Sequence, residues 1–207
     1  MITVHHLENS RSQRILWVLE ELELPYRVQR YERDPKTMLA PKELRRVHPL
    51  GKSPVIEDSG LVVAESGAIV EYLVEKAGGR LGPPQGWGGK LNYRMFLHYA
   101  EGSLMPPLLA LLVVRRLGVL GLPARKPLMK MFSRHLDYLD AELSGRPWFA
   151  GDEITGADIM MSFPLEAAKE RAGLTSEYHH LWEWLERIHA RPAYQRALKA
   201  GGPYAYA

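Results

Sequence analysis

Residues 48–55 read HPLGKSPV, and this stretch constrains the fold more than any other part of the chain. It stands between a short predicted helix and a strand that begins at Pro54. A proline fits the start of an edge strand because its missing N–H removes no ladder hydrogen bond there. A cis bond between Ser53 and Pro54 is the second interpretation, since it would turn the N–H and C=O of Ser53 toward solvent, where a peptide ligand can pair with them. The neighbouring Lys52 is a candidate for holding a carboxylate.

The residues before this stretch predict a β-α-β unit. A β-branched strand spans 2–7, apolar residues then repeat at helical spacing up to Leu22, and residues 26–31 alternate as a second strand. The handedness of such units predicts that the two strands pair in parallel. Ser10 and Gln13 fit a capping box at the start of the helix, and the Ser10 hydroxyl at the carboxyl end of the sheet can also donate to a ligand.

The residues after it predict a hairpin followed by a helix. Strands at 54–58 and 61–64 flank a Ser-Gly turn, and Glu65 and Ser66 begin a helix that ends at a Gly-Gly pair. Ordinary helix capping explains Ser66. The alternative is that the open N–H groups of this helix bind an anion.

The second half of the chain is predicted to be entirely helical. Residues 78–89 contain six glycines and two prolines, which is typical of a linker. Amphipathic segments follow at 90–118, 124–144, 155–171 and 179–190, with a short one after Pro192. Thr155 and Asp158 form a capping box with a structural role. We therefore predict an α/β domain at 1–79, a linker at 80–89 and an all-helical domain at 90–207.

The composition excludes several classes of function. The 207 residues include no cysteine, so disulfides, thiolate metal sites and a protein thiol nucleophile are ruled out. The eight histidines show no metal-site spacing, and no metal is expected. The chain has 27 basic and 24 acidic residues, and its longest runs of basic residues are pairs. This pattern argues against nucleic-acid binding.

No membrane span or leader is predicted, and we expect a cytoplasmic protein. The N-terminus lacks a basic region followed by an apolar one. The apolar stretch 104–114 is shorter than the roughly 20 residues of a spanning helix. The pair Arg115-Arg116 after it is compatible with a membrane surface, but the pattern favours a bundle helix with a solvated end.

Taken together and in this order, the motifs resemble the soluble glutathione transferase family over essentially the full chain. The resemblance is carried by SRSQR at 10–14, HPLGKSP at 48–54, ESGAI at 65–69 and ITGAD at 154–158. Further segments at 10–21, 99–108 and 158–165 look like a bacterial branch similar to a fungal class of the family.

The resemblance implies a thioredoxin-like N-terminal domain that binds glutathione and a helical domain that supplies a pocket for the electrophile. Ser53, next to a cis-Pro54, would pair with the cysteinyl backbone of glutathione. Glu65 and Ser66 would hold its γ-glutamyl end, and Lys52 its glycine carboxylate. Glutathione would be the co-substrate, and the protein would be a homodimer.

The resemblance also suggests which group stabilises the glutathione thiolate. Ser10 stands where serine-type classes place their hydroxyl, with Ser12 and Asn9 as alternatives, while tyrosine and cysteine mechanisms are excluded by the sequence. One hydrogen bond to a charged group contributes about 1.5–3 kcal/mol, enough to lower a thiol pKa of about 8.5 by roughly two units. Tyr99 and Met105 are candidates for the electrophile pocket, although their periodicity explains them equally well as core.

The predicted function is conjugation of the glutathione thiolate to small hydrophobic electrophiles, as in detoxification. Two alternatives remain open. One is a non-catalytic module that holds glutathione or a partner for regulation, and the other is a glutathione-dependent peroxidase that uses the same thiolate.

Overall fold

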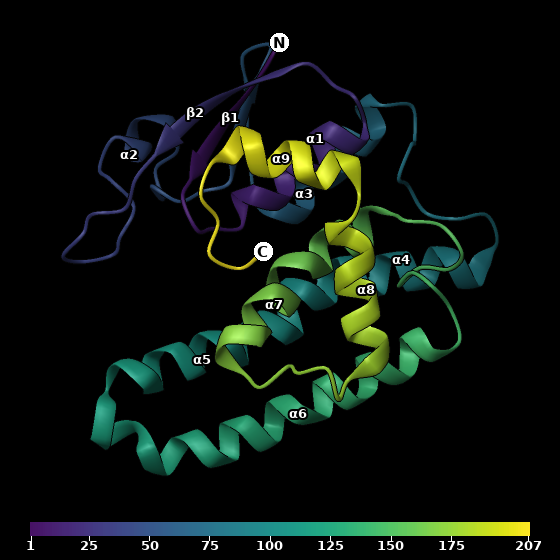
Figure 1. Ribbon diagram of the computed structural model, residues 1–207. Helices are drawn as coiled ribbons and strands as arrows, with labels where there is room; N and C mark the ends of the chain where they lie inside the picture. Colours follow the sequence, from purple (N-terminus) through teal and green to yellow (C-terminus); the bar gives the residue numbers. More distant parts are fainter. The chain divides into compact units, whose positions relative to one another are not determined.

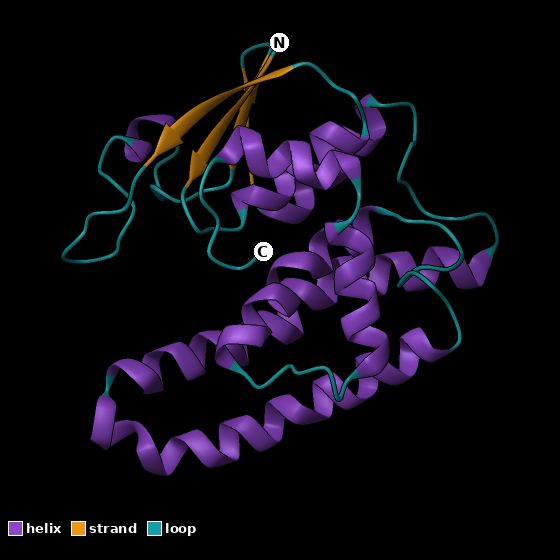
Figure 2. Cartoon of the chain, in the orientation of Figure 1, coloured by secondary structure: helices purple, strands orange, loops and turns teal.

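The computed structural model describes residues 1–207 and divides them into two compact units (Figure 1). The first consists of Met1–Gly82 with His189–Ala205 and Ala207, and the second of Pro83–Ile188 with Tyr206. The first is a thioredoxin-like sheet and helix unit, and the second is helical (Figure 2). Both predicted fold classes are thereby confirmed.

The first unit is built on one four-stranded sheet. Its strands are β1 (Ile2–Leu7), β2 (Tyr26–Tyr31), β3 (Val55–Asp58) and β4 (Leu61–Ala64), in the order β2-β1-β3-β4. The first two pair in parallel, as predicted, while β3 is antiparallel to both of its neighbours. All six residues of β1 are buried, which is the pattern of a central strand covered on both faces.

Two helices lie between these strands in sequence, and a third follows the last strand. They are α1 (Ser12–Glu21), α2 (Leu44–Val47) and α3 (Ser66–Lys76). The α1 helix packs on β1 and on α3, and its residues from Ser12 to Leu19 are all buried. A helix buried around its whole circumference needs a cover on the side away from the sheet.

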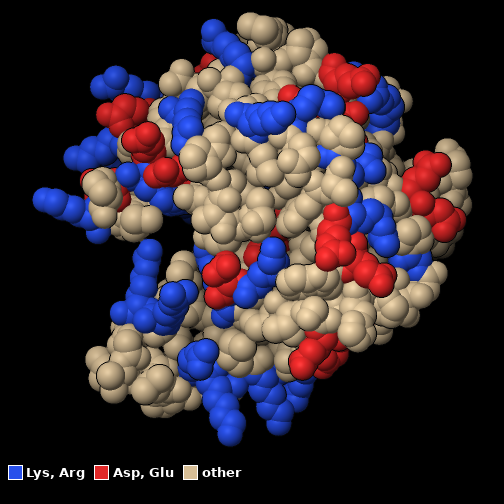
Figure 3. All heavy atoms as spheres, in the orientation of Figure 1, with Lys and Arg blue, Asp and Glu red and all other residues tan.

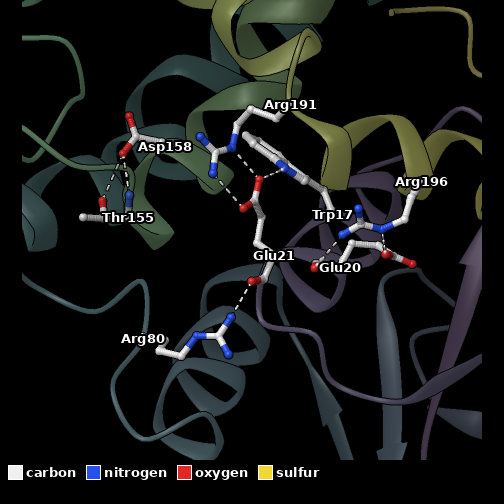
Figure 4. Close-up of polar contacts among 8 residues, drawn as sticks. All are labelled: Trp17, Glu20, Glu21, Arg80, Thr155, Asp158, Arg191 and Arg196. Atoms are coloured by element: carbon white, nitrogen blue, oxygen red, sulfur yellow. Dashed lines mark hydrogen bonds and ion pairs between the residues drawn. The ribbon is translucent and has the colours of Figure 1, made fainter.

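That cover is α9 (Pro192–Gly201), which packs on α1. Arg191 donates to Glu21 through Nε at 2.5 Å and through Nη2 at 2.8 Å, and the Trp17 indole donates to the same carboxylate at 2.9 Å. Arg196 pairs with Glu20 at 2.6 Å (Figure 4). Charge-assisted and bidentate contacts of this kind also fix the orientation of the helix.

The last helix therefore belongs to the first unit, although the sequence analysis placed its residues in the helical domain. Residues 189–205 belong to the first compact unit, although the predicted boundary placed 90–207 together. The reason is the approach of α9 to α1, which is so close that a Cβ at Gly201 would stand 2.5 Å from the Gln13 Oε1 atom. A contact between such distant segments leaves no local pattern in the sequence.

The second unit contains the other helices. They are α4 (Trp87–Tyr99), η1 (Ala100–Leu104), α5 (Met105–Arg116), η2 (Gly118–Gly121), α6 (Leu122–Ser144), α7 (Gly156–Arg171) and α8 (His179–His189). The predicted helices are confirmed, with one difference. The helix expected at 90–118 contains the π turn η1, which directly precedes Pro106 and Pro107. These prolines supply no N–H to the turn before them, so the regular ladder is interrupted there.

The predicted capping box stands at the start of α7. The Ala157 N–H donates to the Thr155 hydroxyl, and the Thr155 N–H donates to the Asp158 carboxylate at 3.0 Å (Figure 4). The same carboxylate accepts from the Phe149 N–H at 3.0 Å and from the Trp184 indole at 3.2 Å. The Thr155 hydroxyl is a fourth donor to this carboxylate, at 3.1 Å. Burial raises the pKa of Asp158, and these four hydrogen bonds oppose that rise.

The continuous helical segment Trp87–Arg116 is long and apolar enough to cross a membrane by length and composition alone. The sequence analysis did not anticipate this, because it expected only the shorter apolar stretch 104–114. Within the second unit, 39% of the most apolar window is buried, and the segment packs against α6 and α7 as the core helix of a bundle does.

Candidate functional site

The predicted site residues of the first unit converge at one edge of the sheet. The carboxyl ends of β1 and β4 and the amino end of β3 lie at this edge, because β3 is antiparallel to both neighbours. The register aligns His5 with Val55, and Val55 with Ala64. The segments that follow β1, precede β3 and follow β4 are therefore neighbours, which sequence distance alone does not indicate.

The Ser53-Pro54 peptide bond is cis, as the sequence interpretation allowed. The Ser53 hydroxyl donates to the His5 carbonyl at 2.7 Å and accepts from the Leu7 N–H at 3.3 Å, so the side chain anchors the loop to β1. The backbone N–H and C=O of Ser53 make no hydrogen bond within the protein. They form one open donor and one open acceptor at the sheet edge, which an extended peptide can use.

The start of α3 supplies the second part of this edge. Glu65 is exposed and has a φ of +72°, in a region that non-glycine residues rarely adopt and that is concentrated at functional sites. Glu65, not Ser66, precedes the first helical residue, so the expected capping role of Ser66 is wrong. The Ser66 side chain is buried at the first position of α3, beside the open N–H groups of the first turn. Lys52, across the edge, is exposed.

The hydroxyls of Ser10 and Ser12 point into the unit. Ser10 donates to the Leu7 carbonyl at 2.7 Å and lies 2.8 Å from the Ser12 oxygen, which in turn lies 2.9 Å from Nδ1 of His6. Both serines are buried. The result is a short polar chain beneath the end of β1 that closes the turn into α1.

The capping box expected from Ser10 and Gln13 does not form. The helix begins at Ser12 after Arg11, which makes no side-chain cap. The Ser12 N–H still donates to the Ser10 oxygen at 3.2 Å, but both polar atoms of the Gln13 amide are buried without a partner. Gln13 Oε1 instead lies beside Gly201 at the end of α9.

His6 is a polar residue at the site that sequence reasoning missed. Burial, with a smaller contribution from the charge of Arg30, lowers its pKa to about 4. Its imidazole is therefore neutral at physiological pH and holds the Ser12 hydroxyl as a neutral partner. The available signal was a pair of adjacent histidines inside the first strand.

Asn9 occupies the turn between β1 and α1. Its φ is +49°, a left-handed conformation that asparagine tolerates better than most residues. Its side-chain oxygen accepts from the Ala205 N–H at 2.8 Å, and its backbone oxygen accepts from Arg33 at 3.3 Å. The amide nitrogen of Asn9 makes no hydrogen bond within the protein. This side chain is half-buried, unlike those of Ser10 and Ser12.

The two candidates for the electrophile pocket lie in the second unit. The Tyr99 hydroxyl is 2.5 Å from Nδ1 of His135, its ring packs on Phe96 and Tyr138, and burial raises its pKa to about 12. Met105 is buried. A cavity of about 590 Å³ in this unit is lined by other residues, from α5, η2, α6 and α7. A pocket role for Tyr99 and Met105 stays a prediction.

Comparison with known proteins identifies the family. The family described as "Glutathione S-transferase, N-terminal domain" matches residues 10–76, and the family described as "Glutathione S-transferase, C-terminal domain" matches residues 123–192. Glutathione S-transferase 3 of Schizosaccharomyces pombe is 37% identical over 93% of this chain and 85% of its own length. The chain belongs to the glutathione S-transferase family. It is a glutathione transferase with fungal relatives, as the sequence motifs indicated.

Solved structures of bacterial glutathione transferases agree with this family. One from Actinobacillus pleuropneumoniae is 34% identical, covers all of this chain and 95% of its own, and superposes with a TM-score of 0.88. A family member from Pseudomonas fluorescens, described with two glutathione molecules bound, is 26% identical, covers 95% and 92% of the two chains and has a TM-score of 0.81. No group of three or more histidine, cysteine or acidic side chains in this transferase is placed to hold a metal.

Proposed function

We propose that this glutathione transferase holds glutathione at the sheet edge of its first unit and conjugates the thiolate to small hydrophobic electrophiles. The observation that carries the proposal is the open backbone N–H and C=O of Ser53. Unpaired backbone groups at a sheet edge bind an extended peptide through main-chain hydrogen bonds. The glutathione described in the relative from Pseudomonas fluorescens supports the same ligand.

The other residues of the edge suit the two ends of glutathione. The γ-glutamyl end carries a carboxylate and an ammonium group. The carboxylate would meet the Ser66 hydroxyl and the open N–H groups of α3, which favour an anion, while the exposed Glu65 carboxylate would pair with the ammonium. Lys52 is free to pair with the glycine carboxylate. The cysteinyl residue would then lie against Ser53, with its sulfur near the end of β1.

We propose Asn9 as the donor to the thiolate, in preference to Ser10. A donor must have a free proton that can reach the ligand. The Ser10 hydroxyl already donates to Leu7, and Ser12 is buried against His6, whereas the amide nitrogen of Asn9 has no partner in the protein. Ser10 and Ser12 would support the turn from beneath. Serine stabilisation of the thiolate remains the alternative.

The reaction follows from a stabilised thiolate. The thiol proton passes to solvent, and the sulfur lone pair forms a bond to an electrophilic carbon. In a substitution the leaving group departs with its bonding electrons, and in an addition the resulting carbanion takes a proton from water. Holding both reactants in one site supplies much of the rate enhancement. Detoxification in the cytoplasm is the setting that we propose for this chemistry.

The test is binding to immobilised glutathione, followed by an assay against aryl halides, α,β-unsaturated carbonyls and organic hydroperoxides. Turnover of the carbon electrophiles is expected. Retention on glutathione without any turnover would instead support a binding or regulatory module, and turnover of hydroperoxides alone would support a peroxidase. A Ser53→Pro variant removes the backbone N–H and should lose retention, whereas Ser53→Ala keeps that N–H and removes only the side-chain anchor, so it is the matched control.

We also propose that the protein is a homodimer, as is typical of its family. Light scattering should then give a mass of twice 23.5 kDa. A mass of 23.5 kDa at micromolar concentration would reject the dimer and leave the glutathione site of the single chain unaffected.

A further inference from the structure

The turn between α5 and α6 exposes four apolar side chains at the end of the helical hairpin. Val119 is 80% exposed and Leu120 84%, and Leu117 and Leu122 beside them are more than half exposed. These four residues are the apolar tip. Monomeric proteins rarely expose neighbouring large apolar side chains unless they serve an interaction.

The tip is held in shape by the backbone. Gly118 has a φ of +55°, which favours glycine, and a Cβ at Gly121 would stand 2.1 Å from the Val114 carbonyl oxygen. Only glycine therefore allows η2 to approach α5 so closely. The exposed Val119 and Leu120 are presented on a tight turn rather than on a loose loop.

The charges around the apolar tip have one sign. No acidic residue occurs from residue 102 to residue 136, whereas this segment contains six basic residues: Arg115, Arg116, Arg125, Lys126, Lys130 and Arg134. Figure 3 shows uncharged side chains projecting at the lower left, where Figure 1 joins α5 to α6, with blue side chains above and below them. An apolar tip between basic groups is complementary to an anionic surface with an apolar interior.

The cavity of about 590 Å³ adjoins the tip and has a similar character. Its lining combines two leucines and one valine of α5 with Arg115 and Arg125, and α7 contributes Glu170 and Arg171. The apolar surface of the tip thus continues inward between basic side chains. Glu170 is the one acidic residue in the cavity lining.

We propose that the apolar tip and its basic flanks dock this protein on the surface of an anionic lipid bilayer. Leucine and valine side chains enter the boundary between headgroups and acyl chains, while arginine and lysine pair with lipid phosphates. The basic residues that flank the tip, with no acidic residue from 102 to 136, favour an anionic bilayer as the occupant. The contact is peripheral and reversible. No residue of the proposed glutathione site takes part in it.

The experiment is sedimentation of the full chain with vesicles of phosphatidylcholine alone and of phosphatidylcholine with 30% phosphatidylglycerol. Binding to the anionic vesicles is expected, with a loss of at least tenfold at high salt and little binding to the neutral ones. Leu120→Asp should reduce binding at least tenfold. Leu39→Asp, at a 65% exposed leucine of the first unit, should not. Arg125→Gln combined with Lys126→Gln should weaken binding and lower its salt dependence.

The absence of cysteine allows a direct measurement of insertion. A Leu120→Cys variant labelled with an environment-sensitive fluorophore should shift to the blue on anionic vesicles, and the same label at Leu39→Cys should not. Equal binding of the wild type and Leu120→Asp, or no shift at position 120, would overturn the proposal. Self-association that depends on Leu120 without lipid would also overturn it, in favour of a second copy of the chain. A urea unfolding transition like that of the wild type shows that each variant is folded.

Discussion

The side-chain oxygen of Asn9 accepts a 2.8 Å hydrogen bond from the backbone N–H of Ala205, which lies 196 positions further along the chain. This contact orients the carboxamide, because one of its two ends is already occupied. The nitrogen is left to donate to a ligand at the end of β1. The C-terminal tail is therefore part of the framework of the proposed thiolate site.

Removing this contact should lower activity without preventing folding. Ala205→Pro deletes the N–H that holds Asn9, while Ala205→Gly keeps it and serves as the matched control. Loss of one neutral hydrogen bond of about 0.5–1.5 kcal/mol should reduce kcat/KM for glutathione by roughly 2- to 10-fold. Equal activity of the two variants would mean that the tail does not position Asn9.

The thiolate donor can be identified from the pKa of the bound thiol. Asn9→Ala should raise this pKa by about one to two units, because a hydrogen bond to a charged group contributes about 1.5–3 kcal/mol. Ser10→Ala and Ser12→Ala should leave it unchanged, although both weaken the turn. The pKa is measured from thiolate absorbance and from the pH profile of kcat/KM. A raised thiol pKa in Ser10→Ala alone would assign the role to the serine.

His6 should make the protein less stable in acid. Its pKa is 6.5 ordinarily and about 4 in the folded chain, so below pH 6.5 the unfolded chain binds a proton that the folded chain does not. The free energy of unfolding should therefore fall between pH 6.5 and 4, by up to about 3 kcal/mol from this group. Urea denaturation of His6→Gln should show a shallower pH dependence over this window. His98→Gln, at an exposed histidine of α4, should keep the wild-type slope.

Asp158 should be required for the stability of the helical unit. Asp158→Ala leaves four buried donors without an acceptor, each at a cost of about 1–3 kcal/mol before relaxation. We expect a loss of at least about 3 kcal/mol in denaturant unfolding. Asp152→Ala, at an exposed aspartate in the loop before α7, should change stability by less than about 0.5 kcal/mol. A small loss in Asp158→Ala would show that water replaces the carboxylate.

The sequence predicted the interactions that join residues only a few positions apart. The helices follow apolar spacing, and the box of Thr155 and Asp158 joins groups three positions apart. The HPLGKSPV and ESGAI motifs identified the edge residues together with their family. These signals are local, so the chain specifies them before it folds.

Only the tertiary structure decided how distant segments use these residues. It turned the hydroxyl of Ser10 inward, withdrew Gln13 from its expected cap, covered α1 with α9 and brought Ala205 to Asn9. It also left the tip around Leu120 exposed, between the helices that the sequence predicted at 90–118 and 124–144. The physical reason is that burial and hydrogen bonding depend on which surfaces meet in space, and the local sequence of two segments 196 positions apart does not record that they meet.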